Sequence, residues 1–98
     1  MIQSIICMNE VGYKTAIATQ HIVVIEINEE SPEPIYSVDV VLSNPEAVPV
    51  GIARFEVIEN AENFLCHLVS MIYNEKTTGI LDIEDMIIEH NGTPYYIN

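Results

Sequence analysis

The sequence predicts an α+β domain, with a mostly antiparallel sheet of about six or seven short strands, one amphipathic helix on a face of the sheet and a C-terminal β-hairpin. Apolar, β-branched segments recur between turn signals over the first 58 residues. The hydrophobic period then changes to three and four residues, which is typical of a helix with one buried face. Near the C-terminus, Asn91-Gly92 separates two apolar segments and is the strongest signal for a two-residue hairpin turn. A chain of 98 residues has room for one core, so residues 1–98 are expected to form a single acidic domain.

Five segments in the first half of the chain are expected to be strands. The clearest is residues 22–28, where five of seven residues are β-branched and the nearly continuous apolar run indicates partial cover on both faces. In residues 52–58, Ala53, Phe55 and Val57 alternate with a second set of side chains, as in a strand with two different faces. The other expected strands are residues 2–8, 13–19 and 35–42. Segments that contain Gly, Asn or Pro are expected to be turns or loops: residues 9–12, 29–34 and 43–49.

A helix is expected from about residue 61 to residue 75. Its apolar side chains recur at three- and four-residue spacing, so that they share one face: Phe64, Leu65, Leu68, Met71 and Ile72. Asn60 is the expected N-cap, because its side chain can accept a hydrogen bond from a free N–H of the first turn. The sequence Thr77-Thr78-Gly79 is expected to stop the helix.

The C-terminal hairpin is expected to pair residues 86–90 with residues 93–97 across Asn91-Gly92. Successive side chains of a strand point to opposite faces. Tyr95 and Tyr96 are therefore expected on different faces, so that one is in the core and the other is a candidate contact.

A second interpretation of this region remains open. Residues 81–87 can instead begin a short helix, with Asp82 as its cap. Of the two, a strand from Met86 onward is favoured, because the hairpin turn signal that follows it is strong.

The charge of the chain excludes several classes of function. Three basic residues against 15 acidic ones give a formal net charge of −12. Nucleic acids and anionic membrane surfaces both attract Lys and Arg, so direct binding to either is not expected. No apolar run approaches the ~18 residues of a membrane span, and the N-terminus lacks the basic start of a signal peptide. Since Cys7 and Cys66 are expected to be reduced and buried, a cytoplasmic location is predicted.

No motif for catalysis or metal binding is present. The four glycines stand far apart, and the Cys-x-x-Cys and His-Glu-x-x-His spacings of zinc sites are absent. Cys66 and His67 are neighbours on the expected helix, where they point about 100° apart and cannot act as one pair. We therefore expect no enzyme activity, no catalytic residue, no metal and no cofactor. Two alternatives to this expectation remain open. One is a cation-dependent enzyme that uses clustered carboxylates, and the other is a metal site where the three histidines and two cysteines converge.

The acidic side chains are concentrated in the second part of the chain. Residues 1–25 carry only Glu10 and Lys14 and sum to zero, so the excess of negative charge belongs to residues 26–98. Most of these acids fall into three groups: Glu26, Glu29, Glu30 and Glu33; Glu56, Glu59 and Glu62; and Asp82, Glu84, Asp85 and Glu89. The simplest interpretation is a solvated surface that keeps a small protein soluble. The functional interpretation is one negative surface for a basic partner, because such a field steers association and sets specificity.

The leading hypothesis is a small, non-enzymatic interaction protein that inhibits a basic nucleic-acid-binding protein by filling its positive cleft, in the manner of a nucleic-acid mimic. The expected partner-binding residues are Glu26, Glu29, Glu30, Glu33, Asp82, Glu84, Asp85, Glu89, Tyr95 and Tyr96. The alternative is an assembly subunit that forms a homo-oligomer through its apolar strands. Core placement is the simpler expectation for the side chains concerned: Ile2, Ile5, Ile6, Ile17, Ile22 and Val24.

Overall fold

The computed structural model describes residues 1–9, 11–30, 33–44, 46 and 48–95, and the predicted α+β fold is confirmed. The strands of the described residues are β1 (Ile2–Met8), β2 (Lys14–Ala18), β3 (Ile22–Glu30), β4 (Ile35–Leu42), β5 (Val50–Phe55), β6 (Gly79–Asp82) and β7 (Thr93–Pro94). The helices are α1 (Ile58–Ile72), α2 (Glu84–Glu89) and a 3-10 turn, η1 (Thr19–His21). The strands predicted at residues 2–8 and 35–42 are confirmed to the residue.

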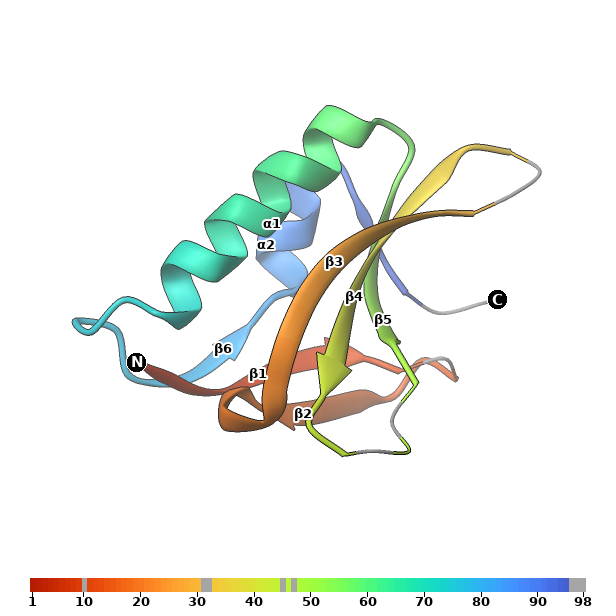
Figure 1. Ribbon diagram of the computed structural model, residues 1–98. Helices are drawn as coiled ribbons and strands as arrows, with labels where there is room; N and C mark the ends of the chain where they lie inside the picture. The colour runs from red at the N-terminus through yellow and green to blue at the C-terminus, as the bar shows by residue number, and fades with distance from the viewer. Residues whose placement is uncertain (10, 31–32, 45, 47, 96–98) are drawn as a thin grey trace.

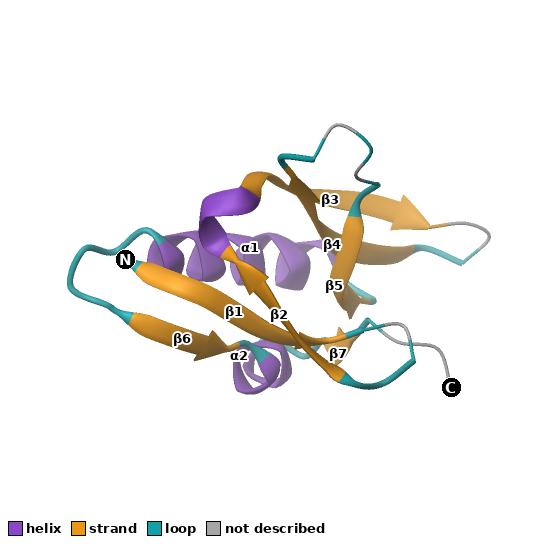
Figure 2. Cartoon of the chain, turned by 90° about the horizontal axis from the view of Figure 1, so that it is seen from below, coloured by secondary structure: helices purple, strands orange, loops and turns teal. Residues whose placement is uncertain are grey.

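The strands divide between two sheets. One has the order β2-β1-β6 and the other the order β3-β4-β5-β7. All neighbours are antiparallel except β1 and β6, which are parallel. Because β6 follows α1 in the chain, this parallel pair joins the hairpin of β1 and β2 to the C-terminal third of the chain. In Figure 1 the β2-β1-β6 sheet lies below and the larger sheet stands beside it, with α1 across both; Figure 2 shows the smaller sheet from below.

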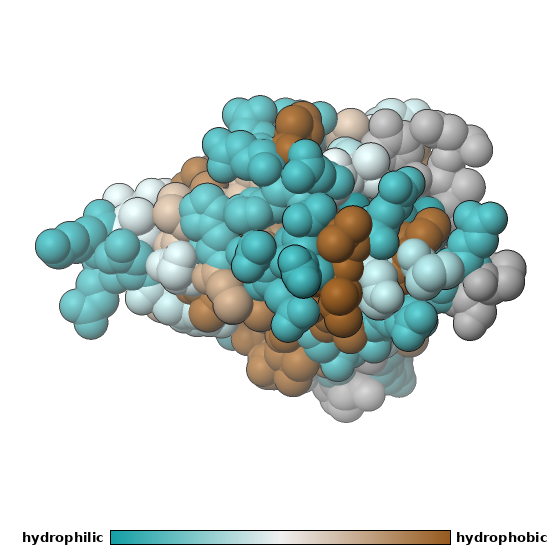
Figure 3. All heavy atoms as spheres, turned by 90° about the horizontal axis from the view of Figure 1, so that it is seen from above, coloured by the Kyte–Doolittle hydropathy of each residue, from teal (hydrophilic) through white to brown (hydrophobic). Residues whose placement is uncertain are grey.

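The core lies between α1 and the two sheets. α1 contacts β1, β3, β4 and β5. Its buried residues follow a three- and four-residue spacing: Ala61, Phe64, Leu68 and Ile72. The rings of Phe64 and Phe55 lie with their centroids 5.2 Å apart, which ties the helix to β5. The opposite face of α1 is mostly hydrophilic (Figure 3) and carries exposed Glu59, Glu62, Asn63, Cys66 and Ser70.

α1 begins and ends earlier in the chain than predicted. It runs from Ile58 to Ile72 rather than over 61–75, so Asn60 lies inside the first turn and is not the N-cap. The expected strand 52–58 is correspondingly shortened, because the last residue of β5 with a partner on β4 is Phe55. Beyond that point the alternating apolar side chains have no strand to pair with, and Ile58 is 45% exposed.

The predicted C-terminal hairpin is wrong, and the alternative of a short helix is correct. Residues 84–89 form α2, and β7 pairs with β5 instead of with residues 86–90. Asn91 has a φ of 62°, and the N–H groups of Asn91 and Gly92 donate to the carbonyls of Ile88 and Ile87 at 3.0 and 2.9 Å. These two bonds form a Schellman cap, which needs the same left-handed residue as a type I′ turn. The local Asn-Gly signal therefore fits both structures equally well.

Burial decides between these two structures. Ile83, Met86 and Ile87 are buried and follow helical spacing, which places all three in the core only if the segment is a helix. The N-cap of α2 is Ile83, so the prediction of Asp82 as the cap is wrong by one residue, although Asp82 Oδ1 accepts a hydrogen bond from the N–H of Glu84 at 3.1 Å. Neither α-helix among the described residues is long and apolar enough to cross a membrane.

Candidate functional site

The central part of the outer face of the larger sheet, on the side away from α1, is polar, whereas Val24, Val41 and Ile35 lie toward its ends. Cross-strand pairing places Glu26 of β3 opposite Asp39 of β4, and Asn28 opposite Ser37, which in turn faces Arg54 of β5. The alternate residues of β4, Val38 and Val40, are fully buried in the core. We call the polar set the outer face, and it consists of Glu26, Asn28, Glu30, Ser37, Asp39 and Arg54, with Tyr95 lying over it.

An amide bridges the two carboxylates at the centre of the outer face. Like charges directly opposite one another across two strands destabilise a sheet. Here Asn28 Nδ2 donates to Asp39 Oδ2 at 2.6 Å and lies 3.3 Å from Glu26 Oε1. Asp39 is 8% exposed, so most of its contact with water is replaced by this donor.

A second cluster joins the predicted contact residues Glu30 and Tyr95. The Tyr95 hydroxyl donates to Glu30 Oε1 at 2.8 Å, and Arg54 Nη2 lies 3.2 Å from Glu30 Oε2. The guanidinium carbon of Arg54 stands 4.4 Å from the centroid of the Tyr95 ring, which is a cation–π distance. The hydrogen bond to Glu30 raises the pKa of Tyr95, because it stabilises the protonated phenol. Glu30, Arg54 and Tyr95 therefore hold one another in place.

Three connections that carry carboxylates come to one end of the larger sheet. β3 ends at Glu30 opposite Ile35, the first residue of β4, and β5 ends at Phe55 opposite Tyr36, the next residue of β4. α1 begins directly after β5, and the end of α2 reaches the same place, since a side chain on Gly92 would touch the Phe55 ring. This region is at the upper right of Figure 1, and we call it the acidic end. Its members are Glu29, Glu30 and Glu33 of the β3–β4 hairpin, Glu56 and Glu59 at the start of α1, and Glu89 at the end of α2.

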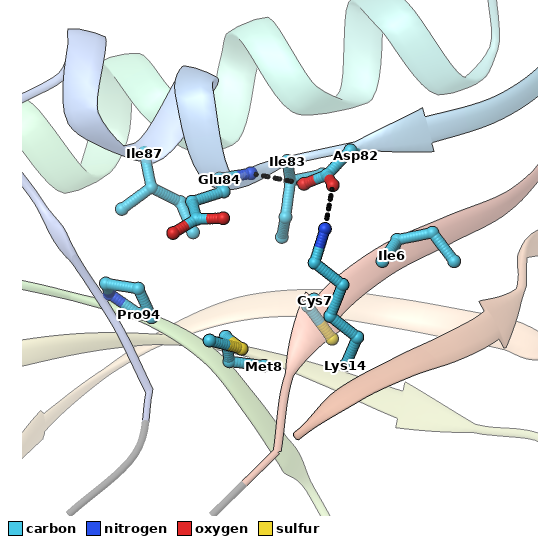
Figure 4. Close-up of a pocket in the computed structure, with 9 residues that line it drawn as sticks. All are labelled: Ile6, Cys7, Met8, Lys14, Asp82, Ile83, Glu84, Ile87 and Pro94. Atoms are coloured by element: carbon cyan, nitrogen blue, oxygen red, sulfur yellow. Dashed lines mark hydrogen bonds and ion pairs between the residues drawn. The ribbon is translucent and has the colours of Figure 1, made fainter. Parts of the chain in front are cut away.

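The predicted third group of acids is divided by the fold. Asp82, Glu84 and Asp85 lie at the start of α2, at the other end of that helix from Glu89. Lys14 Nζ pairs with Asp82 Oδ2 at 3.1 Å, as Figure 4 shows. The N–H of Glu84 and the Lys14 ammonium both hold the pKa of Asp82 below its usual value. The space enclosed by these residues with Cys7 and Pro94 is about 10 Å³, which accommodates at most one water molecule.

Three residues that organise the outer face are not among those predicted from the sequence: Asn28, Asp39 and Arg54. One signal for Asp39 is present in the sequence, because it is the only charged residue within the apolar strand 35–42. Arg54 lies in the alternating segment 52–58, on the face opposite Phe55. Tyr96 lies outside the described residues.

The cysteines and histidines are also placed by the fold. Cys7 and Cys66 are both free thiols. Cys7 is buried on β1, and burial together with the nearby Asp82 charge raises the pKa of its thiol to about 11. Cys66 is exposed, so the expectation that it packs in the core is wrong. Among the described residues no three His, Cys, Asp or Glu side chains are grouped as metal ligands, but His67 and His90 meet as a pair with 3.1 Å between ring nitrogens.

Comparisons with protein families, with functionally characterised proteins and with solved structures find no significant match to this chain. Its function is therefore inferred from its own residues.

Proposed function

We propose that the protein is a small acidic interaction protein that antagonises a basic nucleic-acid-binding protein. The observation that supports this best is the acidic end, where the β3–β4 hairpin, the start of α1 and the end of α2, each of which carries carboxylates, come to one end of the larger sheet. Arg54 is the basic residue in this region, and Glu30 already pairs with it. Lys14 pairs with Asp82 beside β1, and Lys76 follows the far end of α1.

The mechanism is occlusion of a positive cleft. Lys and Arg side chains that bind phosphates create a positive potential in the cleft. This potential attracts any regular array of negative charge. Most carboxylates of the acidic end are exposed and have no ion-pair partner within the described part of the chain: Glu29, Glu33, Glu56, Glu59 and Glu89. They stand on short connections of a packed sheet and helix. Little loop entropy is therefore lost when they meet a partner.

The outer face extends this surface. Glu26 and Glu30 are half-buried there, and Tyr95 adds an aromatic ring that is rigidly held between Arg54 and Gly51. A rigid aromatic side chain contributes contact area at small entropic cost. We therefore assign the partner surface to the acidic end together with the residues of the adjoining outer face that reach solvent, Glu26, Asn28, Glu30 and Tyr95. Asp82, Glu84 and Asp85 are left outside it.

Two matched variants test the proposal. One replaces three carboxylates of the acidic end, E29Q/E33Q/E56Q. The control replaces three exposed carboxylates elsewhere, E46Q/E75Q/D85N, and changes the net charge by the same amount. Wild-type protein and both variants are used as baits in lysate pull-downs washed at about 50 and about 200 mM salt, and the bound proteins are identified by mass.

We expect the wild type to bind a basic nucleic-acid-binding protein at the lower salt concentration. At the higher salt concentration this binding is expected to be weakened or lost. The acidic-end variant is expected to bind it at least ten times more weakly, and the control within about twofold, in a titration with the purified partner. Equal weakening by both variants would mean that net charge alone attracts the partner. Retention of no basic protein by the wild type would refute the proposal.

A second candidate function, self-assembly, is supported by the free edge of β3. β3 is the first strand in the order β3-β4-β5-β7, so its outer edge has no strand partner among the described residues. Val23 and Val24 on this strand are 60% and 44% exposed. An unpaired strand edge of this kind is a template for a second chain. In contrast, Ile2, Ile5, Ile17 and Ile22 are buried in the core and Ile6 is half-buried, whereas the expectation that Val24 lies in the core is wrong.

Light scattering with size exclusion separates the two candidates. Self-assembly predicts a mass above the 11.0 kDa of one chain that increases with salt, since salt screens the repulsion between acidic copies. The variant V23K/V24K is expected to return that mass to the single chain. A wild-type mass of one chain at every salt concentration would exclude assembly through β3.

A further inference from the structure

A pair of histidines joins α1 to the end of α2. His67 lies on α1, and His90 is the C-cap of α2. Nδ1 of His67 and Nε2 of His90 are 3.1 Å apart, and the two ring planes cross at 68°. Both rings are half-buried, and within the described residues neither ring has another hydrogen bond. This pair takes no part in the surface proposed above.

The separation of the two nitrogens matches a chelating pair. Zinc binds imidazole nitrogen at about 2.0–2.1 Å. Two such bonds to nitrogens that are 3.1 Å apart enclose an angle of about 98°, between the octahedral value of about 90° and the tetrahedral value of about 109°. The same distance suits a hydrogen bond between two neutral rings. A metal ion can therefore replace the shared proton once each ring turns to direct its nitrogen lone pair at the ion, with the separation of the two nitrogens unchanged.

The surroundings favour a cation at this position. Phe64, which is fully buried, meets His90 edge to face with ring centroids 6.1 Å apart and so limits the rotation of that ring. Glu89 precedes His90, and the other carboxylates of the acidic end lie on the neighbouring connections. Their field raises the local concentration of divalent cations. Imidazole ligands then select among these cations, since they suit Zn²⁺, Cu²⁺ and Ni²⁺ better than Mg²⁺ or Ca²⁺.

We propose that His67 and His90 bind one transition-metal ion of the zinc class, with water completing its coordination, and that the ion links α1 to α2. Each histidine supplies one nitrogen. Because the ligands come from two helices that are separate in sequence, the bound ion stabilises the folded chain over the unfolded one.

Zinc titration of the full-length chain tests this. The affinity is measured by calorimetry, and thermal unfolding is then followed at ten times the measured Kd, with Mg²⁺ at the same concentration as the baseline for charge screening. The wild type is expected to gain about 6–11 °C in Tm over that baseline. His67→Gln and His90→Gln are each expected to lose most of this gain. Two controls are expected to keep it: His21→Gln, whose ring lies beside Ser43, and Cys66→Ser, which removes the exposed thiol next to His67.

Three results would overturn the proposal. The first is an increase in Tm with zinc that is as large in the two glutamine variants as in the wild type. The second is loss of this increase only in Cys66→Ser, and the third is an equal increase in Tm with Mg²⁺. If a glutamine variant does not fold, the ring signals of the three histidines are followed by NMR in the wild-type protein instead. Zinc is expected to shift the signals of His67 and His90 and to leave His21 unchanged, and any other pattern excludes the site.

Discussion

Loss of the Cys7 proton is expected to destabilise the fold at alkaline pH. Cys7 is 5% exposed on β1 and lines the small space beside Asp82 (Figure 4). Burial first, and the Asp82 charge second, raise the pKa of this thiol from 9.0 to about 11. Both causes act in the same direction, because a thiolate loses its hydration there and lies near a second negative charge.

The sign and size of the effect follow from linkage. The folded chain holds the Cys7 proton more tightly than the unfolded chain, so the thiol contributes its full share of stability below pH 9 and loses it as the pH rises toward 11. A shift of two pKa units corresponds to about 2.7 kcal/mol when the loss is complete, and about 2 kcal/mol is lost by a pH of about 10.5.

Urea denaturation of the wild type and of Cys7→Ala, at pH values of about 8 and 10.5 in the presence of a reductant, measures this loss. The difference in free energy of unfolding between the two proteins removes the contribution of tyrosines and lysines, which titrate in both. That difference is expected to change by about 2 kcal/mol between the two pH values, in the direction that favours Cys7→Ala at the higher pH. Cys66→Ala, which alters the exposed thiol, serves as the control. A difference that stays constant within about 0.5 kcal/mol would refute the reasoning.

Three further substitutions test the core, the cap of α2 and the outer face. Phe64→Ala removes a fully buried ring and is expected to lower the free energy of unfolding by about 3–5 kcal/mol in urea, whereas a loss below about 1 kcal/mol would place Phe64 outside the core. Asn91, with its φ of 62°, is expected to tolerate Gly but to lose about 1 kcal/mol as Ala, and equal stabilities of these two variants would contradict the left-handed cap. Gly51→Ala places a Cβ 2.6 Å from the Tyr95 ring and is expected to displace it, so that the pKa of Tyr95 falls toward its ordinary value in a spectrophotometric titration. An unchanged pKa would show that the ring keeps its hydrogen bond despite the added methyl group.

The elements that were predicted correctly are those in which local pattern and burial agree. In β1 and β4, β-branched residues lie between clear turn signals, and both strands have the predicted bounds. The apolar spacing of α1 identified its buried face through Phe64, Leu68 and Ile72, although its ends were displaced. Ends depend on where a neighbouring strand stops pairing, and Phe55 marks that point only once β4 is in place.

The C-terminal region shows why a strong local signal can mislead. Asn91 adopts a left-handed conformation, as the Asn-Gly signal implies, but that conformation caps a helix here. The candidate surface, too, cannot be derived from local sequence patterns. Sequence alone grouped Glu89 with Asp82, whereas the fold places them at opposite ends of α2 and pairs Asp82 with Lys14.

The amino-acid sequence by itself determined the fold class and the strongly acidic character of the protein. These properties depend on composition and on periodicities of two and about 3.6 residues, which are local. The tertiary structure alone decided which carboxylates share a surface, which of them Arg54 and Lys14 neutralise, and that His67 meets His90 across two helices. Each of these contacts joins residues far apart in the chain, and their positions follow only when the two sheets and α1 bury a common core.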